Sequence, residues 1–275
     1  MKAAIDIGSN SIRLALSDGT TLSQITQLAA GIEKSGKLSA DGVTATIDAL
    51  KEYKAICDQK DCESVFTFAT EAVRRASDGN RFIQQAKEQT GLTITLLSPQ
   101  QEAELALMGA TKPDGPVTVC DLGGGSLEII CSQDGKTPTF VTSLPLGVVV
   151  LKNKFNGDYR RAIDEMPRLL TECSSVPHYP VVLCGGSATS IAAAILNLKA
   201  YDKNAVSTKF TAKQLDDIMP ILLSKNLSTF RPICAKRADT IPYGAILIQT
   251  LLNYLSASEF YVSDSSNLEA VLKYN

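Results

Sequence analysis

The chain has 275 residues, of which 44% are hydrophobic and 20% are charged, with a formal net charge of −2. This composition is ordinary for a globular protein and fits one large or two smaller domains. It speaks against a general nucleic-acid binder, which is usually basic, so any polyanionic ligand must be held by local positive potential.

Short apolar runs alternate with segments of helical spacing, which predicts an α/β fold. Strands are predicted at residues 2–8, 11–19, 20–29, 64–70 and 92–98, on both sides of a glycine turn within 117–135, and at 181–186 and 259–264. Helices are predicted at residues 39–59, 71–91 (with an interruption near Asp78-Gly79), 99–112, 147–173, 187–198, 211–225, 236–256 and 266–273. No window approaches a membrane span of roughly 20 apolar residues. The first ten residues do not resemble a signal peptide, so a cytoplasmic location without a membrane partner is expected.

Cysteine and histidine usage excludes two kinds of site. The seven cysteines are odd in number and several lie in apolar runs, as expected for reduced, buried thiols. Cys57 and Cys62 are five residues apart, with no second ligand pair, so a structural metal site is not expected there. His178 is the only histidine and lies in a loop-like segment, which argues against a histidine-based triad.

An internal repeat indicates that the chain is duplicated. Residues 6–14 read DIGSNSIRL and residues 121–129 read DLGGGSLEI. Both follow the pattern acid, apolar, Gly, x, x, Ser, apolar, charged, apolar, and each lies near the start of one half of the chain. We therefore expect two similar domains, 1–115 and 116–275, that face each other across a cleft, with a last helix near 264–275 packing back on the first domain.

The first repeat predicts a phosphate-binding turn. Gly8 permits a tight turn, and consecutive N–H groups in such a turn bind anions. Ser9, Asn10 and Ser11 add small hydrogen-bonding side chains. Arg13 shares a strand face with Ser11, and two interpretations stay open for it: a ligand contact or a surface arginine.

The second repeat predicts a matching turn. Three consecutive glycines, Gly123, Gly124 and Gly125, are costly to order and suit a backbone that approaches a ligand closely. Ser126 and Glu128 share one strand face. The alternative is a mobile hairpin tip, which the apolar runs on both sides make less favourable.

Acids at the strand ends predict a divalent cation. Asp6 and Asp121 each end a buried strand, where a carboxylate needs a partner. Mg²⁺, or another divalent cation such as Mn²⁺, binds one or two carboxylates together with phosphate oxygens and water. The alternative is that both acids only cap turns.

A third glycine turn, Gly185–Gly186–Ser187, opens a helix and favours a further phosphate or a nucleoside.

Two further side chains could complete a catalytic site. Arg74 follows a predicted strand and could neutralise the charge of a transferring phosphoryl group. Ser98 and Gln101 form a capping-box pattern, which places Glu102 in the first turn of a helix. Glu102 is therefore either an acid that complements the helix dipole or a base that orients water.

These residues resemble a known family. The segments DIGSNSIRL, ATEAVRRA, SPQQEAELAL, DLGGGSLEI, SLPLGVV and GGSATS occur in the order found in the exopolyphosphatase / guanosine pentaphosphate phosphohydrolase (Ppx/GppA) family, short two-domain type. The resemblance implies two duplicated actin-like, Hsp70-like (ribonuclease H-like) domains. It also implies Mg²⁺-dependent release of terminal phosphate from polyphosphate or from pppGpp, by a monomer or homodimer without nucleic acid.

The resemblance also implies roles for individual residues. Glu102 matches the family's catalytic glutamate, Arg74 its phosphate-contacting arginine, and Asp121 and Glu128 its metal- and water-organising acids. Residues 9–11 and 123–126 match its phosphate loops.

The chain departs from the family pattern at three places. Val150 stands where arginine is frequent, Ser207-Thr208 replaces a His-Gly pair, and the segment 262–270 reads VSDSSNLEA. Two other functions stay open. The glycine loops alone do not exclude a kinase or ATPase of the same fold, and the departures motivate a non-catalytic sensor of phosphate-rich ligands.

Overall fold

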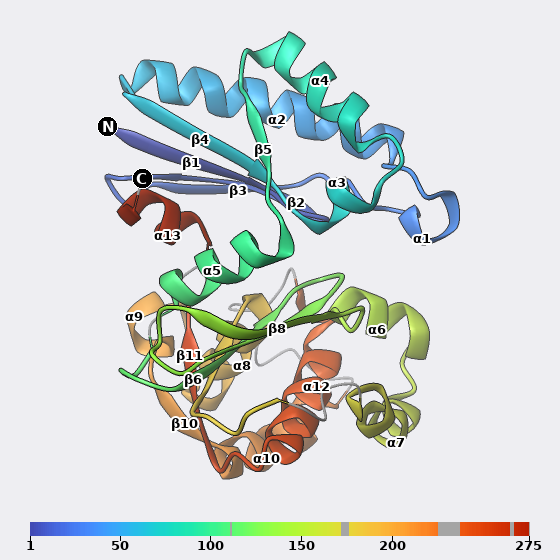
Figure 1. Cartoon of the computed structure of the whole chain (residues 1–275). Coiled ribbons are helices and arrows are strands. Elements are labelled where there is room, and N and C mark those ends of the chain that lie inside the picture. Colours follow the sequence, from blue (N-terminus) through green and yellow to red (C-terminus); the bar gives the residue numbers. More distant parts are fainter. Residues whose placement is uncertain (111, 172–175, 225–236, 265–266, 275) are drawn as a thin grey trace. The chain divides into compact units, whose positions relative to one another are not determined.

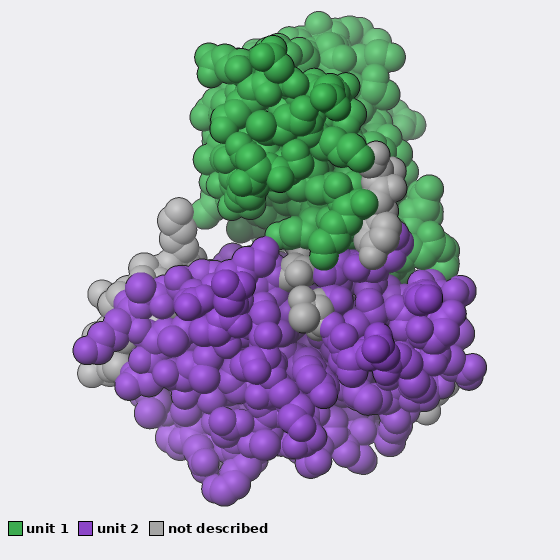
Figure 2. Space-filling model, turned by 90° about the vertical axis from the view of Figure 1, so that its left-hand side faces the viewer, with its two compact units in different colours: residues 1–105, 267–275 green, residues 106–266 purple. Residues whose placement is uncertain are grey.

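The computed structural model describes residues 1–110, 112–171, 176–224, 237–264 and 267–274. The chain forms two compact units, coloured separately in Figure 2. Unit 1 contains Met1–Leu105 and Asn267–Asn275, and unit 2 contains Ala106–Ser266. The division falls within helix α5 (Pro99–Gly109), upstream of the boundary at residue 115 that the sequence suggested.

Unit 1 is built on a five-stranded mixed sheet (Figure 1). Its strands are β1 (Lys2–Ile7), β2 (Ser11–Leu16), β3 (Thr21–Ile25), β4 (Ser64–Ala69) and β5 (Ile94–Leu96). The order is β3-β2-β1-β4-β5, with β1, β4 and β5 parallel to one another and the first three strands antiparallel. The central strand β1 is buried from Ala3 onward, which explains the apolar residues Ala3–Ile5 and Ile7 and makes Asp6 a buried acid.

Helices cover both faces of this sheet. Those of unit 1 are α1 (Ile32–Ser35), α2 (Ala40–Gln59), α3 (Glu71–Arg75), α4 (Gly79–Thr90) and α13 (Asn267–Tyr274). Helices α2 and α4 pack on one face through Leu50, Tyr53 and Phe82. On the other face, Leu268 and Val271 of α13 pack on Phe68 of β4. The C-terminal helix therefore belongs to the core of unit 1.

Unit 2 is built on a six-stranded mixed sheet. Its strands are β6 (Val117–Leu122), β7 (Leu127–Ser132), β8 (Pro138–Leu144), β9 (Val181–Cys184), β10 (Lys209–Thr211) and β11 (Glu259–Ser263). Their order is β10-β11-β9-β6-β7-β8, with β6, β9 and β11 parallel. Read from the other end, this order repeats the arrangement of unit 1 and adds one strand.

The helices of unit 2 enclose a large core. They are α6 (Val148–Phe155), α7 (Tyr159–Leu169), α8 (Gly186–Ile195), α9 (Lys203–Val206), α10 (Ala212–Leu222) and α12 (Ile241–Tyr254). Helix α8 is buried on all sides from Ser187 to Ala194. Small residues allow this, since a Cβ on Gly244 of α12 would lie 2.8 Å from the Ser187 Cβ.

The repeated strand order confirms the predicted fold class of two duplicated α/β domains. How the two units face each other, and therefore the expected cleft, stays a prediction. In the described part of the chain, no helix has the length and apolar character needed to cross a bilayer. Some predicted positions lie outside the described residues. They are residues 111, 172–173, 225, 236 and 266 of the predicted helices, and part of the segment 262–270.

Several predicted boundaries differ from the structure. The helix predicted at 147–173 is two helices, because Asn156 (φ 44°) and Gly157 (φ 90°) turn the chain between α6 and α7. The predicted strand 20–29 ends at Ile25, shortly before Gln27 (φ 52°). Strand β8, strand β10 and the short helices α1 and α9 were not predicted.

Candidate active site

The loop after β1 has carbonyls that accept hydrogen bonds from a later part of the chain, and two successive N–H groups that donate to none of the described residues. The Gly8 N–H donates to the Ser11 carbonyl at 3.0 Å and closes the turn. The Asn10 carbonyl accepts from Thr26 N and Gln27 N, both at 3.0 Å. Within the described ranges, the N–H groups of Ser9 and Asn10 donate no hydrogen bond. Such consecutive N–H groups suit an anion.

The loop after β6 repeats this geometry. The Gly123 N–H donates to the Ser126 carbonyl at 3.0 Å. The carbonyls of Gly123 and Gly124 accept from Val148 N at 3.0 Å and Val149 N at 2.9 Å, in the first turn of α6. As far as the structure describes the chain, the N–H groups of Gly124 and Gly125 donate to no protein acceptor. The two hairpin turns are thus structural equivalents.

Gly147 explains why this second loop keeps its shape. It is the N-cap of α6, and a Cβ at this position would lie 2.3 Å from the carbonyl carbon and oxygen of Gly124 and from the carbonyl carbon of Gly125. Only glycine permits this approach of helix and loop without displacing backbone. The sequence motif SLPLGVV therefore has a direct structural reason next to DLGGGSLEI.

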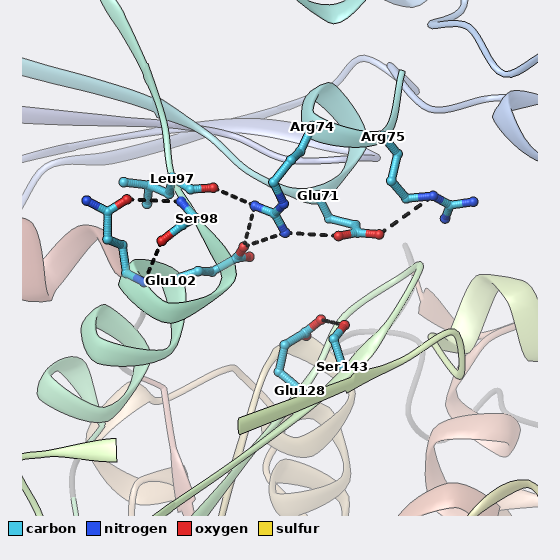
Figure 3. Close-up of polar contacts among 9 residues, drawn as sticks. Glu71, Arg74, Arg75, Leu97, Ser98, Glu102, Glu128 and Ser143 are labelled. Atoms are coloured by element: carbon cyan, nitrogen blue, oxygen red, sulfur yellow. Dashed lines mark hydrogen bonds and ion pairs between the residues drawn. The ribbon is translucent and has the colours of Figure 1, made fainter. Parts of the chain in front are cut away.

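The acids of the two hairpins have different cross-strand partners. Asp6 pairs in register with Arg13. Its carboxylate accepts a hydrogen bond from the Arg13 guanidinium, and the two groups form an ion pair. Asp121 pairs in register with Glu128, whose carboxylate accepts from the Ser143 hydroxyl at 2.9 Å (Figure 3). Like charges directly opposite each other destabilise an antiparallel pair. The hairpin of unit 1 therefore places an acid opposite an arginine, whereas the equivalent positions in unit 2 hold two acids.

The third glycine turn lies beside Asp121. Gly185 has a φ of +93°, and a Cβ there would lie 2.6 Å from the Leu122 carbonyl and 3.0 Å from the Asp121 carboxylate oxygen. Helix α8 begins at Gly186, one residue before the predicted start at Ser187. Burial raises the pKa of the Cys184 thiol well above its usual range, and the Asp121 carboxylate raises it further.

Arg237 also contacts this turn and was not predicted. Its guanidinium lies against Gly186, where a Cβ would come within 2.2 Å of the guanidinium carbon. Its Nη1 donates to the Gly186 carbonyl at 3.4 Å, across 51 residues of sequence. No motif in the sequence indicates this contact, because it depends on how the chain returns to the sheet edge.

Arg74 and Glu102 meet in unit 1. Arg74 Nη1 donates to the Leu97 carbonyl at 2.6 Å and contacts a Glu102 carboxylate oxygen at 3.3 Å (Figure 3). Arg74 Nη2 contacts the same Glu102 oxygen at 3.4 Å and the Glu71 carboxylate at 2.9 Å. The side chains of Arg74 and Glu102 are only 23% and 19% exposed, so this network is more than a surface ion pair.

The predicted capping box places Glu102. The Ser98 N–H donates to the Gln101 side-chain oxygen at 3.0 Å, and the Gln101 N–H donates to the Ser98 hydroxyl at 3.2 Å. These reciprocal bonds fix the start of α5, so that Glu102 lies in its first turn.

Topology brings the unit 1 residues to one sheet edge. Strands β1, β4 and β5 are parallel, with Ile7 beside Ala69 and Ala69 beside Leu96. The phosphate-type loop, Arg74 and Glu102 follow these three strand ends in turn, and ligands of α/β sheets bind outside such carboxyl ends.

In unit 2, Asp121 lies at the carboxyl end of β6, and the two glycine turns follow the parallel strands β6 and β9. The described residues contain no group of three or more His, Cys, Asp or Glu side chains that could hold a metal ion. Each unit therefore gathers its predicted residues at one edge. Their assembly across the two units stays a prediction.

Comparisons with known proteins give one consistent answer. The model of the Ppx/GppA phosphatase family matches residues 12–273. A solved member of that family from Aquifex aeolicus shares 31% identity with a TM-score of 0.84, covering 98% of this chain and 95% of its own. An exopolyphosphatase structure from Cytophaga hutchinsonii shares the fold, with 22% identity, a TM-score of 0.82 and coverage of 98% and 96%.

Curated relatives differ in length. Exopolyphosphatase 2 of Mycobacterium tuberculosis is 27% identical over 290 residues, which is 92% of this chain and 90% of that protein. The bifunctional 3-dehydroquinate synthase/phosphatase of Fusobacterium nucleatum is 25% identical over 98% of this chain, which spans only 45% of that protein. The match over residues 12–273 and the shared fold together show that the chain belongs to the Ppx/GppA phosphatase family.

Proposed function

We propose that this protein releases the terminal orthophosphate of inorganic polyphosphate, or of the guanosine nucleotide pppGpp, by attack of water. The contact between Arg74 and Glu102, at the sheet edge where the Gly8–Ser11 loop lies, carries the proposal. Phosphoryl transfer to water needs charge neutralisation and an oriented nucleophile. This pair can supply both. Family membership and the likeness to Exopolyphosphatase 2 support the same substrate class.

The hairpin loops would hold the phosphate chain. In each loop, two carbonyls accept hydrogen bonds from the segment that follows the third strand of the sheet, residues 26–29 in unit 1 and 148–150 in unit 2, and two successive amides are left for a ligand. Backbone amides are fixed dipoles, and they bind phosphate oxygens without reorganising during the reaction. The third turn, with Arg237 beside Gly186, would hold a further phosphate or the nucleoside.

Glu102 would orient and deprotonate the attacking water. Its carboxylate is mostly buried, and one of its oxygens lies 3.3 and 3.4 Å from the two terminal nitrogens of Arg74. Those contacts are long for a charge-assisted hydrogen bond, and they hold the carboxylate beside the guanidinium. Arg74 itself would stabilise negative charge on the phosphoryl group.

The pair Asp121 and Glu128 fits a divalent cation. Two carboxylates in register across β6 and β7 repel each other, and a bound cation removes that repulsion. Mg²⁺ or Mn²⁺ is commonly held by one or two carboxylates, with phosphate oxygens and waters as the other ligands. When bound there, the ion would neutralise phosphate charge. Asp6, also predicted as a ligand, already accepts the Arg13 guanidinium, so our proposal places the ion in unit 2.

Phosphate release tests the proposal. Initial rates would be measured with polyphosphate of defined lengths, pppGpp and ATP, with Mg²⁺, with Mn²⁺ and with EDTA. We expect release from polyphosphate or pppGpp that EDTA abolishes. Turnover of ATP alone, or a phosphorylated acceptor, would indicate a kinase or ATPase. Tight binding without any release would indicate a sensor.

A matched pair of variants tests the base. Glu102→Gln should lower kcat by about a hundredfold or more, since general base catalysis typically contributes 10²–10⁴-fold. Glu104→Gln makes the same charge change on the same helix, where Glu104 accepts from Gln100 at 3.2 Å and from no other described residue, and it should retain activity. Equal rates for the two variants would exclude Glu102 as the base.

A further inference from the structure

Glu71 lies in the segment ATEAVRRA, but no role in the Arg74 network was predicted for it. It is the first residue of the five-residue helix α3, and Arg74 lies three residues later. One Glu71 carboxylate oxygen accepts from Arg74 Nη2 at 2.9 Å, and the other lies 3.7 Å from Arg75 Nε. Figure 3 shows the Glu71 carboxylate between the two arginines. A single acid thus contacts two adjacent guanidinium groups.

The distances divide the contacts of Arg74 into two classes. The Leu97 carbonyl holds Nη1 at 2.6 Å and Glu71 holds Nη2 at 2.9 Å, whereas Glu102 lies 3.3 and 3.4 Å from the two nitrogens. The short contacts each fix one end of a planar fork. The plane of the guanidinium is therefore set by Leu97 and Glu71, and Glu102 adds a weaker contact.

This division has a consequence for catalysis. If Glu102 alone held the Arg74 guanidinium, the guanidinium would move whenever the carboxylate took up a proton. It would also move whenever a phosphoryl group took the place of Glu102 beside Arg74. Anchors on both terminal nitrogens keep the guanidinium in place during such changes, and preorganised charge is what stabilises a phosphoryl transition state. A fully exposed i,i+3 ion pair would contribute little free energy to holding the arginine. Here the pair is largely shielded from solvent, since the Arg74 side chain is 23% exposed and the Glu71 side chain 33%.

We propose that Glu71 is a positioning residue that, together with the Leu97 carbonyl, fixes the Arg74 guanidinium for transition-state stabilisation; the inference rests on the proposed function. Glu71 acts through Arg74 and does not contact the substrate. Its loss should therefore reduce kcat and leave KM almost unchanged, because the phosphate chain is bound by the loop amides.

Kinetics of a variant series tests this. Glu71→Ala should lower kcat about tenfold, as expected for loss of one hydrogen bond to a charged group, with KM within about twofold of wild type. Glu71→Gln keeps an oxygen acceptor for Nη2 and should recover part of the loss. In an Arg74→Ala background, adding Glu71→Ala should change kcat less than about twofold. Wild-type kcat in Glu71→Ala, or an equal loss in both backgrounds, would overturn the inference.

Two measurements separate this inference from the proposed function. Arg75→Gln removes the other arginine at Glu71 and should retain kcat. A crystal structure of Glu71→Ala should show Arg74 Nη2 displaced and the guanidinium plane rotated about the remaining contact between Nη1 and the Leu97 carbonyl. An unmoved Arg74 refutes the positioning role whatever the enzyme hydrolyses. If the wild-type protein releases no phosphate from polyphosphate or pppGpp, the proposed function fails, and the crystal structure still decides the geometry.

Discussion

Gly147→Ala should disable the second phosphate-type loop without touching any side chain of the site. The backbone of Gly147 has φ −64° and ψ 151°, which alanine adopts without strain. The added Cβ would lie 2.3 Å from the carbonyl carbons of Gly124 and Gly125, whereas non-bonded carbons sit about 3.5 Å apart. The loop must therefore retreat by about 1 Å.

A displacement of that size has calculable effects. A misplacement of about 1 Å in an active site can lower the rate about a hundredfold, and overpacking of this kind typically costs about 1–3 kcal/mol of stability. We expect a large loss of kcat for phosphate release and a modest fall in Tm, measured by thermal unfolding followed by circular dichroism.

Gly157→Ala is the control for general destabilisation. Gly157 has a φ of +90° and nothing within 4 Å of an added Cβ, so alanine there is strained but displaces no neighbour. This variant should lose about 1 kcal/mol of stability and keep its kcat. Wild-type kcat in Gly147→Ala would refute the assignment of the Gly124–Gly125 amides to phosphate binding.

Two further predictions follow from burial and charge. The Thr67 hydroxyl is buried with no hydrogen-bond partner among the described residues, so Thr67→Val should raise the free energy of unfolding by about 1 kcal/mol. Thr46→Val, which removes a 2.7 Å bond to the Gly42 carbonyl, should lower it, and denaturant unfolding of both variants checks the opposite signs. Asp121→Asn should raise the Mg²⁺ concentration for half-maximal activity about tenfold or more, whereas Asp6→Asn should leave it unchanged. An equal increase for both would restore Asp6 as a ligand.

Local patterns predicted much of the fold. The apolar runs that end in DIG and DLG gave the central strands, and the pattern of Ser98 and Gln101 gave the start of α5. These signals involve residues within a few positions of each other. Strand β8 was missed although PTFVTSL contains β-branched residues, because half-exposed edge strands carry a weak apolar signal.

The candidate site was predicted only where a motif marks it. The glycine turns, Arg74 and Glu102 belong to recognisable segments, and the structure gathers them at sheet edges. Arg237 and Glu71 were not predicted. Arg237 reaches Gly186 across 51 residues, and an acid three residues before an arginine is common on surface helices, so the sequence cannot show that the Leu97 carbonyl completes the arrangement.

The two hairpins also show how a repeat can hide a difference in chemistry. At the sequence level, Arg13 and Glu128 occupy the same charged position of one pattern. The strand register places each directly opposite an aspartate. The residue opposite the aspartate is an arginine in unit 1 and a second acid in unit 2, where our proposal places the divalent cation. Duplication of the fold therefore does not imply two metal sites, and a single divalent cation per chain is the stoichiometry that calorimetric titration of the phosphate-bound protein should give.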